Sequence, residues 1–305
     1  MKRTDYLPYL AGTLMALIFG FSYLFIEAGL AVFEPFELLC YRFTLAAAVI
    51  TALAAFRIIK INLKGKPVHM LIFLSFFQPL CYFVCETMAV KYASVSETGI
   101  FIAFIPVFVT ILAYLILKEK PYSKQIVFIL ISVSGAVFDV IMSGSFEYRG
   151  NMFGMLCLIG IVLSSGGYNI MSRKSSKIFS PIEITFVMMW SAAIFYNAIN
   201  LVEILVRGRD GSLALLFSFH GVIPILYLGV LSSIGGFFLL NYILSKLSVA
   251  SASVFSQLCS IVAILSGVTI GGETLHWYQV ASGILILAGV FGTNYYENKM
   301  KGEVI

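Results

Sequence analysis

Charged residues are scarce in this chain of 305 residues. Asp, Glu, Lys and Arg together make up 11% of it, whereas hydrophobic residue types make up 60% and the mean hydropathy is +0.97. A soluble domain of ordinary composition carries about 25% charged residues. The composition therefore excludes a soluble globular protein and a disordered one, and it indicates a protein embedded in a membrane.

Histidine is rare as well, and the few cysteines are dispersed. The three histidines show none of the spacings of a metalloenzyme, and "TIGGET" lacks the Lys-Ser/Thr pair of a phosphate-binding loop. The five cysteines all fall inside apolar runs, so we expect no disulfide framework. These residues are His69, His220, His276, Cys40, Cys81, Cys85, Cys157 and Cys259. We accordingly expect no enzyme, no metal site and no cofactor.

The chain is instead a series of apolar runs about 20 residues long, the length at which an α-helix crosses a bilayer. The first run follows a basic start and is too long for a cleaved secretory signal, so we interpret it as a membrane helix. The ten expected spans are 7–29, 36–59, 67–90, 96–117, 125–142, 152–171, 181–206, 219–244, 252–270 and 277–295. The sequence thus predicts an all-α membrane protein with ten transmembrane helices.

The basic residues predict the orientation of these spans. If the N-terminus is cytoplasmic, all but five of the 20 basic residues fall in cytoplasmic segments. The exceptions are Lys91, Arg149, Arg207 and Arg209 outside and Arg42 within a span. The positive-inside rule therefore predicts that both termini are cytoplasmic, and it explains the net charge of +5 without nucleic-acid binding.

The two halves of the chain carry matching residues at nearly constant offsets. At an offset of 146, "EPFELL" aligns with "SPIEIT", which pairs Pro35 with Pro181 and Glu37 with Glu183. At an offset of 154, the pairs are Glu119 with Glu273, Gln125 with Gln279 and Gly135 with Gly289. Because five spans is an odd number, the second half enters the membrane from the opposite side. We therefore expect an inverted repeat of residues 1–146 and 147–305, a feature of secondary transporters.

These residues resemble the drug/metabolite transporter superfamily, in its ten-helix EamA type. The resemblance is carried by "FGFSYLFIEAGL", "EPFELLCYRFTLAAA", "KYASVSETGIFIAFIPVFVTILAYLILKEK" and the repeated Glu-Gln-Gly spacing. It implies an inner-membrane transporter with a cavity lined by the first, third, fourth, sixth, eighth and ninth helices. The chain departs from the family pattern at Phe19, where Trp is usual, at Glu27, where a basic residue is frequent, and at Met188, the second-half position of Arg42.

Polar residues at helical spacing identify candidates for the cavity wall, because lipid-facing positions cannot satisfy polar groups. The third span carries Gln78, Tyr82 and Glu86 on one face, and the ninth carries Ser253, Ser256 and Gln257. The first and sixth spans correspond at "FGFSY" and "SGGYN", which adds Ser22, Tyr23, Tyr168 and Asn169, and the eighth span adds Asn241. Packing between helices uses the same small polar residues, so both roles stay open.

Charged residues inside or beside the spans form a second group of candidates. Arg42, Glu37, Glu86 and Glu97 lie toward the outer ends of their spans. They form either an outer gate or protonatable network, with Glu86 as its best member, or a structural ion pair with Arg42. The charge of Glu86 depends on the balance between burial and a neighbouring Arg. Glu119 and Glu273 precede helices at the membrane edge, where we expect them to brace turns through the helix dipole.

The predicted function is secondary transport of small metabolites by alternating access, with export of amino acids or amino-acid-like compounds as the leading form. The alternatives are uptake of a vitamin-like or nucleoside-like aromatic metabolite and a non-transporting membrane scaffold. The expected partners are a small-molecule substrate, the lipid bilayer of the cell membrane and a coupling ion such as the proton. A homodimer stays open, and no nucleic acid is expected.

Overall fold

The computed structural model describes residues 6–92, 95–143, 151–207, 218–270 and 274–303, and in these ranges all regular structure is helical. Eight helices in the described residues are long and apolar enough to cross a membrane. The continuous helices are α1 (Leu7–Leu30), α2 (Pro35–Ala55), α7 (Ser123–Met142), α8 (Met152–Ser175), α9 (Pro181–Arg207), α13 (Val249–Thr269) and α14 (Trp277–Glu303).

Three of the expected spans are divided into shorter helical pieces. The third consists of α3 (His69–Ser75), the π-helical η1 (Phe76–Cys81) and α4 (Tyr82–Tyr92). The fourth consists of α5 (Val95–Ala103), α6 (Ile105–Leu112) and η2 (Ala113–Leu117), and the eighth of α11 (Phe219–Leu226), η3 (Tyr227–Gly236) and α12 (Phe237–Lys246). Each of them contains a proline, which lacks a backbone N–H: Pro79 lies inside η1, Pro224 inside α11, and Pro106 in the first turn of α6. Segments of this kind concentrate at functional sites.

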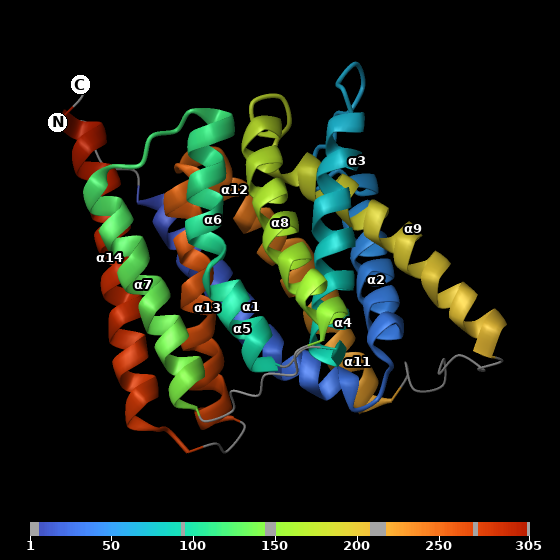
Figure 1. Ribbon diagram of the computed structural model, residues 1–305. Coiled ribbons are helices and arrows are strands. Elements are labelled where there is room, and N and C mark those ends of the chain that lie inside the picture. Colours follow the sequence, from blue (N-terminus) through green and yellow to red (C-terminus); the bar gives the residue numbers. More distant parts are fainter. Residues whose placement is uncertain (1–5, 93–94, 144–150, 208–217, 271–273, 304–305) are drawn as a thin grey trace.

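The helices form a bundle in which distant parts of the chain are neighbours (Figure 1). The helix α7 packs along α14, and α2 packs along α9. The helix α1 packs on α13 and on the broken eighth span, while α8 packs on the broken third span and on α5 and α6. Exchanging the two halves of the chain leaves the α7–α14 and α2–α9 pairings unchanged and converts the pairings of α1 into those of α8.

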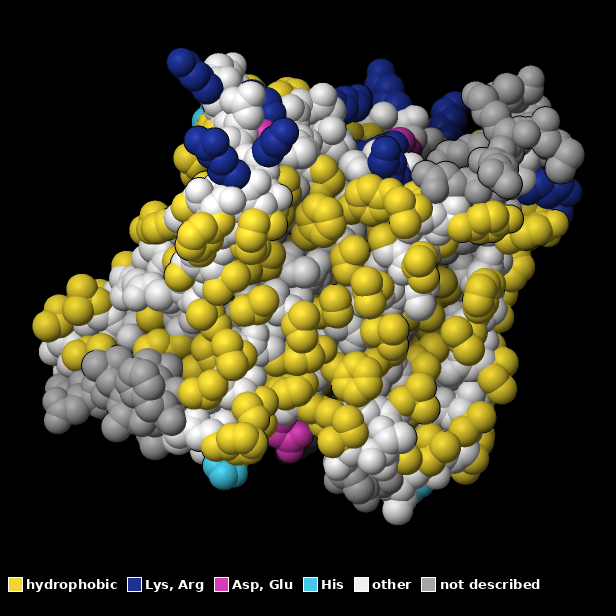
Figure 2. Space-filling model, turned by 180° about the vertical axis from the view of Figure 1, so that it is seen from behind, with side chains coloured by type: hydrophobic (Ala, Val, Ile, Leu, Met, Phe, Trp, Pro, Cys, Tyr) yellow, Lys and Arg dark blue, Asp and Glu magenta, His cyan; other side chains and the backbone are white. Residues whose placement is uncertain are grey.

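One side of the bundle carries both ends of the described chain. Tyr6 and Tyr9 at the start of α1 lie beside Tyr295 and Asn298 near the end of α14. We call this side the terminal face and the opposite side, where α1 ends at Leu30, the far face. Large apolar side chains cover the flank between the two faces, while Lys and Arg side chains gather toward the terminal face (Figure 2). This distribution is that of a protein surrounded by lipid.

Polar side chains stabilise the starts of four helices in the same way. In each, a Glu or Gln at the third helical position accepts a hydrogen bond from the backbone N–H three residues earlier, as in a capping box. The pairs are Glu34 N–H to Glu37 at 3.4 Å, Ser180 N–H to Glu183 at 2.9 Å, Tyr122 N–H to Gln125 at 2.9 Å and His276 N–H to Gln279 at 2.9 Å. The acceptors are residues that match between the halves of the sequence.

Candidate functional site: a central cavity

A cavity of about 410 Å³ lies inside the bundle toward the far face. Its walls come from α1, α2, α4, α5, α7, α13, α14 and η3, and most of the side chains are apolar. Leu30 and Pro35, at the turn between α1 and α2, belong to its lining and mark its outer end. This volume lies in the usual range for small-molecule sites, which are apolar pockets with a few placed polar groups.

Arg42 is the one cation among the described residues of the cavity wall, and it is only 3% exposed. Its Nε donates a hydrogen bond to Ser233 Oγ at 2.7 Å, and its Nη2 donates to Ser232 Oγ at 3.1 Å. The guanidinium carbon lies 5.2 Å from the ring centre of Phe43 and 5.1 Å from that of Phe83. Two hydroxyl groups and two aromatic faces therefore hold the guanidinium in one orientation.

The serines that bind Arg42 lie in the π-helical segment η3 of the eighth span, and a related contact reaches η1 of the third span. Tyr196 of α9 donates its hydroxyl hydrogen to the carbonyl oxygens of Pro79 and Leu80 in η1, both at 3.1 Å. A polar side chain of α2 thus contacts the break in the eighth span, and one of α9 contacts the break in the third. Broken helices within a membrane need such partners for their freed backbone groups.

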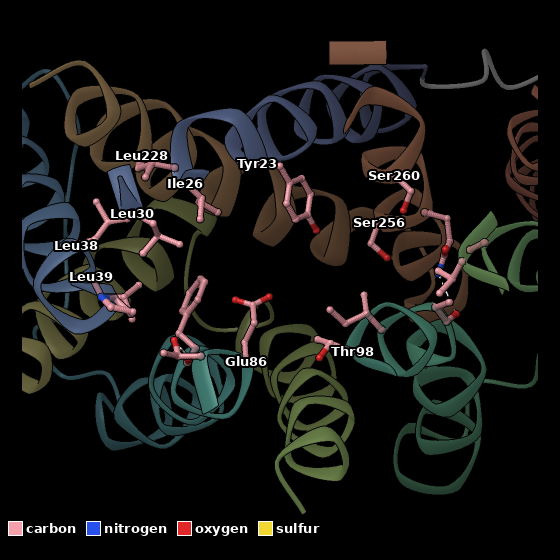
Figure 3. Close-up of a pocket in the computed structure, with 18 of the residues that line it drawn as sticks. Tyr23, Ile26, Leu30, Leu38, Leu39, Glu86, Thr98, Leu228, Ser256 and Ser260 are labelled. Atoms are coloured by element: carbon pink, nitrogen blue, oxygen red, sulfur yellow. Dashed lines mark hydrogen bonds between the residues drawn. The ribbon is translucent and has the colours of Figure 1, made fainter. Parts of the chain in front are cut away.

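The carboxylate of Glu86 on α4 interacts electrostatically with this guanidinium. It also interacts with Tyr82 and with Tyr23. In Figure 3 the Glu86 carboxylate and the Tyr23 hydroxyl point into one opening from opposite walls, and Ser256 of α13 faces the same space. The arrangement places a carboxylate and a guanidinium in one apolar cavity, where their interactions with a ligand are weakly screened.

Five of the polar candidates from the sequence meet at this cavity. They are Tyr23, Arg42, Glu86, Ser256 and Gln257. Gln257 also donates a hydrogen bond from Nε2 to the carbonyl oxygen of Ala103 at 3.0 Å, which joins α13 to the end of α5. Tyr82 does not line the cavity but interacts with Glu86 from the same helix. Gln78 lies in η1 with extended backbone angles, at φ −146° and ψ 125°, outside the lining.

Other polar candidates are buried between helices. Asn241 is fully buried and accepts hydrogen bonds from Tyr168 at 2.9 Å and Ser172 at 2.7 Å, while its Nδ2 donates to Thr185 at 3.2 Å. This network joins α8, α9 and α12. The side chains of Ser22, Asn169 and Ser253 donate to carbonyl oxygens of their own helices, those of Ile18, Ser165 and Ala250. None of these side chains belongs to the described cavity wall.

The remaining carboxylate candidates lie away from the cavity or outside the described side chains. Glu37 accepts a hydrogen bond from the Tyr41 hydroxyl at 2.9 Å, in addition to its capping contact. Glu119 accepts from Arg173 Nε at 3.0 Å and from the Val249 N–H at 3.0 Å, at the terminal face. The side chain of Glu97 and all of Glu273 lie outside the described part of the chain.

The sequence reasoning missed three residues that matter in this arrangement. Ser232 and Ser233 hold Arg42, but a Ser-Ser pair in an apolar span is common in helix packing and gave no separate signal. Asp139 of α7 lines the cavity and accepts a hydrogen bond from Ser282 at 3.3 Å. A carboxylate inside an apolar run is itself a signal of function and would have identified Asp139.

The fold and the cavity define an integral, multi-pass membrane protein of the transporter class. The chain belongs to the EamA-like transporter family, whose sequence pattern matches residues 7–140 and again residues 152–295. This result confirms the resemblance inferred from the sequence. Membership implies a small-molecule substrate and a lipid environment.

Individual relatives agree with this assignment. A protein of Bacillus subtilis (strain 168) described as "Uncharacterized transporter YcxC" is 36% identical, over 96% of this chain and 95% of its own. A "Probable amino-acid metabolite efflux pump" of Salmonella typhimurium (strain LT2) is 22% identical, over 91% of each chain. A crystal structure with 18% identity superposes with a TM-score of 0.80, covering 97% of this chain and 99% of the other, and shows the same fold.

Proposed function

We propose that this protein is a secondary transporter of the cell membrane that exports amino-acid-like metabolites by alternating access. The observation that carries the proposal is the pairing of Arg42 and Glu86 in one apolar cavity. An amino acid carries a carboxylate and an ammonium group, which have their complements in a guanidinium and a carboxylate. Arg42 uses only part of its N–H groups on the two serines, so donors remain for a substrate carboxylate.

The two faces of the bundle differ in a way that supports alternating access. The cavity reaches toward the far face, whereas the terminal face carries polar contacts between helices, and those of Glu119 join the two halves of the chain. Glu119 bridges Arg173 and the start of α13, and Glu297 accepts two hydrogen bonds from Ser248, at 3.0 and 2.7 Å. We therefore interpret this arrangement as a conformer open toward the far face, and in the proposed cycle the contacts of Glu119 would open in turn.

The internal repeat is the second support, because alternating access in many transporters exchanges the conformations of two inverted halves. The matched capping residues and the exchangeable helix pairings both favour such a repeat of residues 1–146 and 147–305. Ten spans with both termini on the same side of the membrane would follow from it, and we expect that side to be the cytoplasm. The gathering of Lys and Arg toward the terminal face (Figure 2) favours the same orientation.

A transport assay tests this proposal directly. Purified protein in liposomes preloaded with an unlabelled amino acid should accumulate the same amino acid in radiolabelled form by counterflow, relative to protein-free liposomes. The relative named as an efflux pump makes amino acids the first panel to examine. Saturable binding without any counterflow would favour the scaffold alternative, and counterflow restricted to aromatic compounds such as nucleosides would favour the uptake alternative.

A further inference from the structure

The cavity holds a second carboxylate whose hydrogen bonds are incomplete. Three buried or half-buried carboxylates elsewhere in the described residues each accept at least two hydrogen bonds of about 3 Å. Glu183 accepts from Lys66, Asn62 and Ser180, Glu119 from Arg173 and Val249, and Glu297 twice from Ser248. Asp139 accepts only one, on Oδ1, from the Ser282 hydroxyl at 3.3 Å. Ionised carboxylates have room for several donors, so Asp139 retains acceptor capacity toward the cavity.

The position of Asp139 separates it from the Arg42 and Glu86 pair. Asp139 lies on α7 and accepts a hydrogen bond from Ser282 of α14, whereas Glu86 lies on α4. The hydrogen bonds of Arg42 in the described structure go to Ser232 and Ser233. Among the described lining residues, two carboxylates with spare acceptor capacity therefore share the cavity with one guanidinium, which donates part of its N–H groups to serines.

The charges of these three side chains favour a ligand with complementary charges. A cationic nitrogen that leaves water for a largely apolar cavity loses its hydration, and only a charge-assisted hydrogen bond replaces it well. A substrate with one amino group satisfies one of the two carboxylates and leaves the other without a partner. A substrate with two cationic nitrogens and one carboxylate satisfies all three charged groups.

We propose that the cavity selects basic amino acids, and that Asp139 is a specificity-determining residue that binds the side-chain cation. Glu86 binds the second nitrogen, and Arg42 binds the substrate carboxylate. This inference rests on the proposed transport of amino-acid-like compounds and names the substrate class of the same site. The inference applies to amino acids with a cationic side chain, such as lysine, and not to amino acids without one.

Counterflow in proteoliposomes with radiolabelled L-lysine, L-leucine and L-glutamate tests this assignment. We expect lysine to exchange faster than leucine, and glutamate to be excluded. The Asp139→Asn variant should lose at least about tenfold of lysine exchange, the factor that corresponds to one charge-assisted contact, and keep leucine exchange within about twofold. Asp139→Glu should retain the preference for lysine. Glu27→Gln is the matched control, because Glu27 is an exposed carboxylate on α1 outside the cavity wall.

The outcomes separate this inference from the proposed function. Leucine exchange that exceeds lysine exchange, or equal losses of both in Asp139→Asn, overturns the role of Asp139 and leaves amino-acid transport intact. Exchange of none of the three amino acids overturns the proposed function and the inference together. Size-exclusion profiles of the purified variants show whether each is folded, and Asp139→Glu supplies the answer if Asp139→Asn fails to fold.

Discussion

Gly135 of α7 and Gly289 of α14 take equivalent places in one helix crossing. A Cβ atom at Gly135 would lie 2.9 Å from the carbonyl oxygen of Ser282, and one at Gly289 would lie 2.6 Å from that of Phe128. The offset of 154 residues that separates the two glycines also separates Phe128 from Ser282. Each glycine therefore meets the residue of the other helix that is equivalent to the one its counterpart meets. Such reciprocal contacts are characteristic of a two-fold arrangement.

Substitution at this crossing should destabilise the protein, because the two helices approach each other there to backbone contact. In Gly289→Ala the new methyl group would meet Ser132 and backbone atoms of α7 at 2.5–2.6 Å, so the helices must separate. We expect a loss of about 1–3 kcal/mol, the usual cost of overpacking, and a lower temperature of unfolding in detergent. Fluorescence-detected size exclusion after heating measures this change.

Gly283 provides the matched control on the same helix. No heavy atom within 4 Å would meet a Cβ at this position. Gly283→Ala should therefore leave the stability unchanged or raise it by roughly 0.5–1 kcal/mol, because alanine favours the helix more than glycine does. Equal losses in Gly283→Ala and Gly289→Ala would argue against close packing as the reason for the glycine.

The hydroxyl of Tyr168 gives a second prediction, which separates packing from substrate contact. Tyr168→Phe removes the 2.9 Å hydrogen bond to Asn241, although Ser172 still donates to the same oxygen. We expect a loss of stability of about 1 kcal/mol and an unchanged KM for counterflow, because Tyr168 lies outside the cavity wall. A several-fold change in KM with unchanged stability would instead indicate that Tyr168 contacts the substrate.

These residues show what the sequence can and cannot predict here. Hydrophobic length and the repeated Glu-Gln-Gly spacing predicted the helical class, and Gln125 and Gly135 proved to have capping and packing roles. The polar stripes predicted the cavity only in part, because polar residues avoid lipid whether they face a cavity or another helix. Asn241 and Gln257 are equally polar and equally buried, and only the fold distinguishes them.

The hydrogen-bond partners of Arg42 could not be predicted from the sequence, for a different reason. A π-helical segment changes the angular spacing of its side chains, so the regular helical period does not predict where Ser232 and Ser233 point. From charge alone, the sequence suggests a carboxylate as the partner of Arg42. In the structure Arg42 donates hydrogen bonds to two serine hydroxyl groups and interacts with Glu86 electrostatically.

Arg42 and Ser233 should therefore be energetically coupled. A planar guanidinium donates to both serines while it lies between two rings, and the ammonium group of Lys cannot reproduce this geometry. We expect Arg42→Lys to lower both stability and transport, and Ser233→Ala to cost about 1–3 kcal/mol. A double-mutant cycle should give a coupling energy of about 0.5–3 kcal/mol. Strictly additive losses would mean that the hydrogen bond is not made in the membrane.

Removing the charge of Glu86 should impair transport and spare folding. Glu86→Gln keeps the shape of the side chain but removes the negative charge that faces the cavity beside Tyr23 and Arg42. We expect counterflow to fall by at least about tenfold, with unchanged abundance in the membrane by immunoblotting. Wild-type flux in this variant would exclude Glu86 from the substrate site, and the exposed Glu27→Gln serves as its control.

The contact between Glu119 and Arg173 should keep the terminal face closed. Glu119 joins Arg173 at the end of α8 to the N–H of Val249 at the start of α13. Glu119, Arg173 and Ala250 line a smaller space of about 240 Å³. Loss of the carboxylate charge weakens both contacts, so Glu119→Gln should populate conformers that are open at this face. Water would then reach Ala250, which is 5% exposed in the closed arrangement.

Thiol labelling at this position measures the opening. In a background without the native cysteines, Ala250→Cys should react several times faster with a membrane-impermeant maleimide when Glu119→Gln is present, provided that the reagent is offered from the terminal side. Lys120→Gln is the matched control, because Lys120 lines the same space and is exposed. Removing its charge leaves the bond between Glu119 and Arg173 in place, so the rate should stay at that of the parent. Equal rates in all three proteins would show that this ion pair stabilises the bundle without gating it.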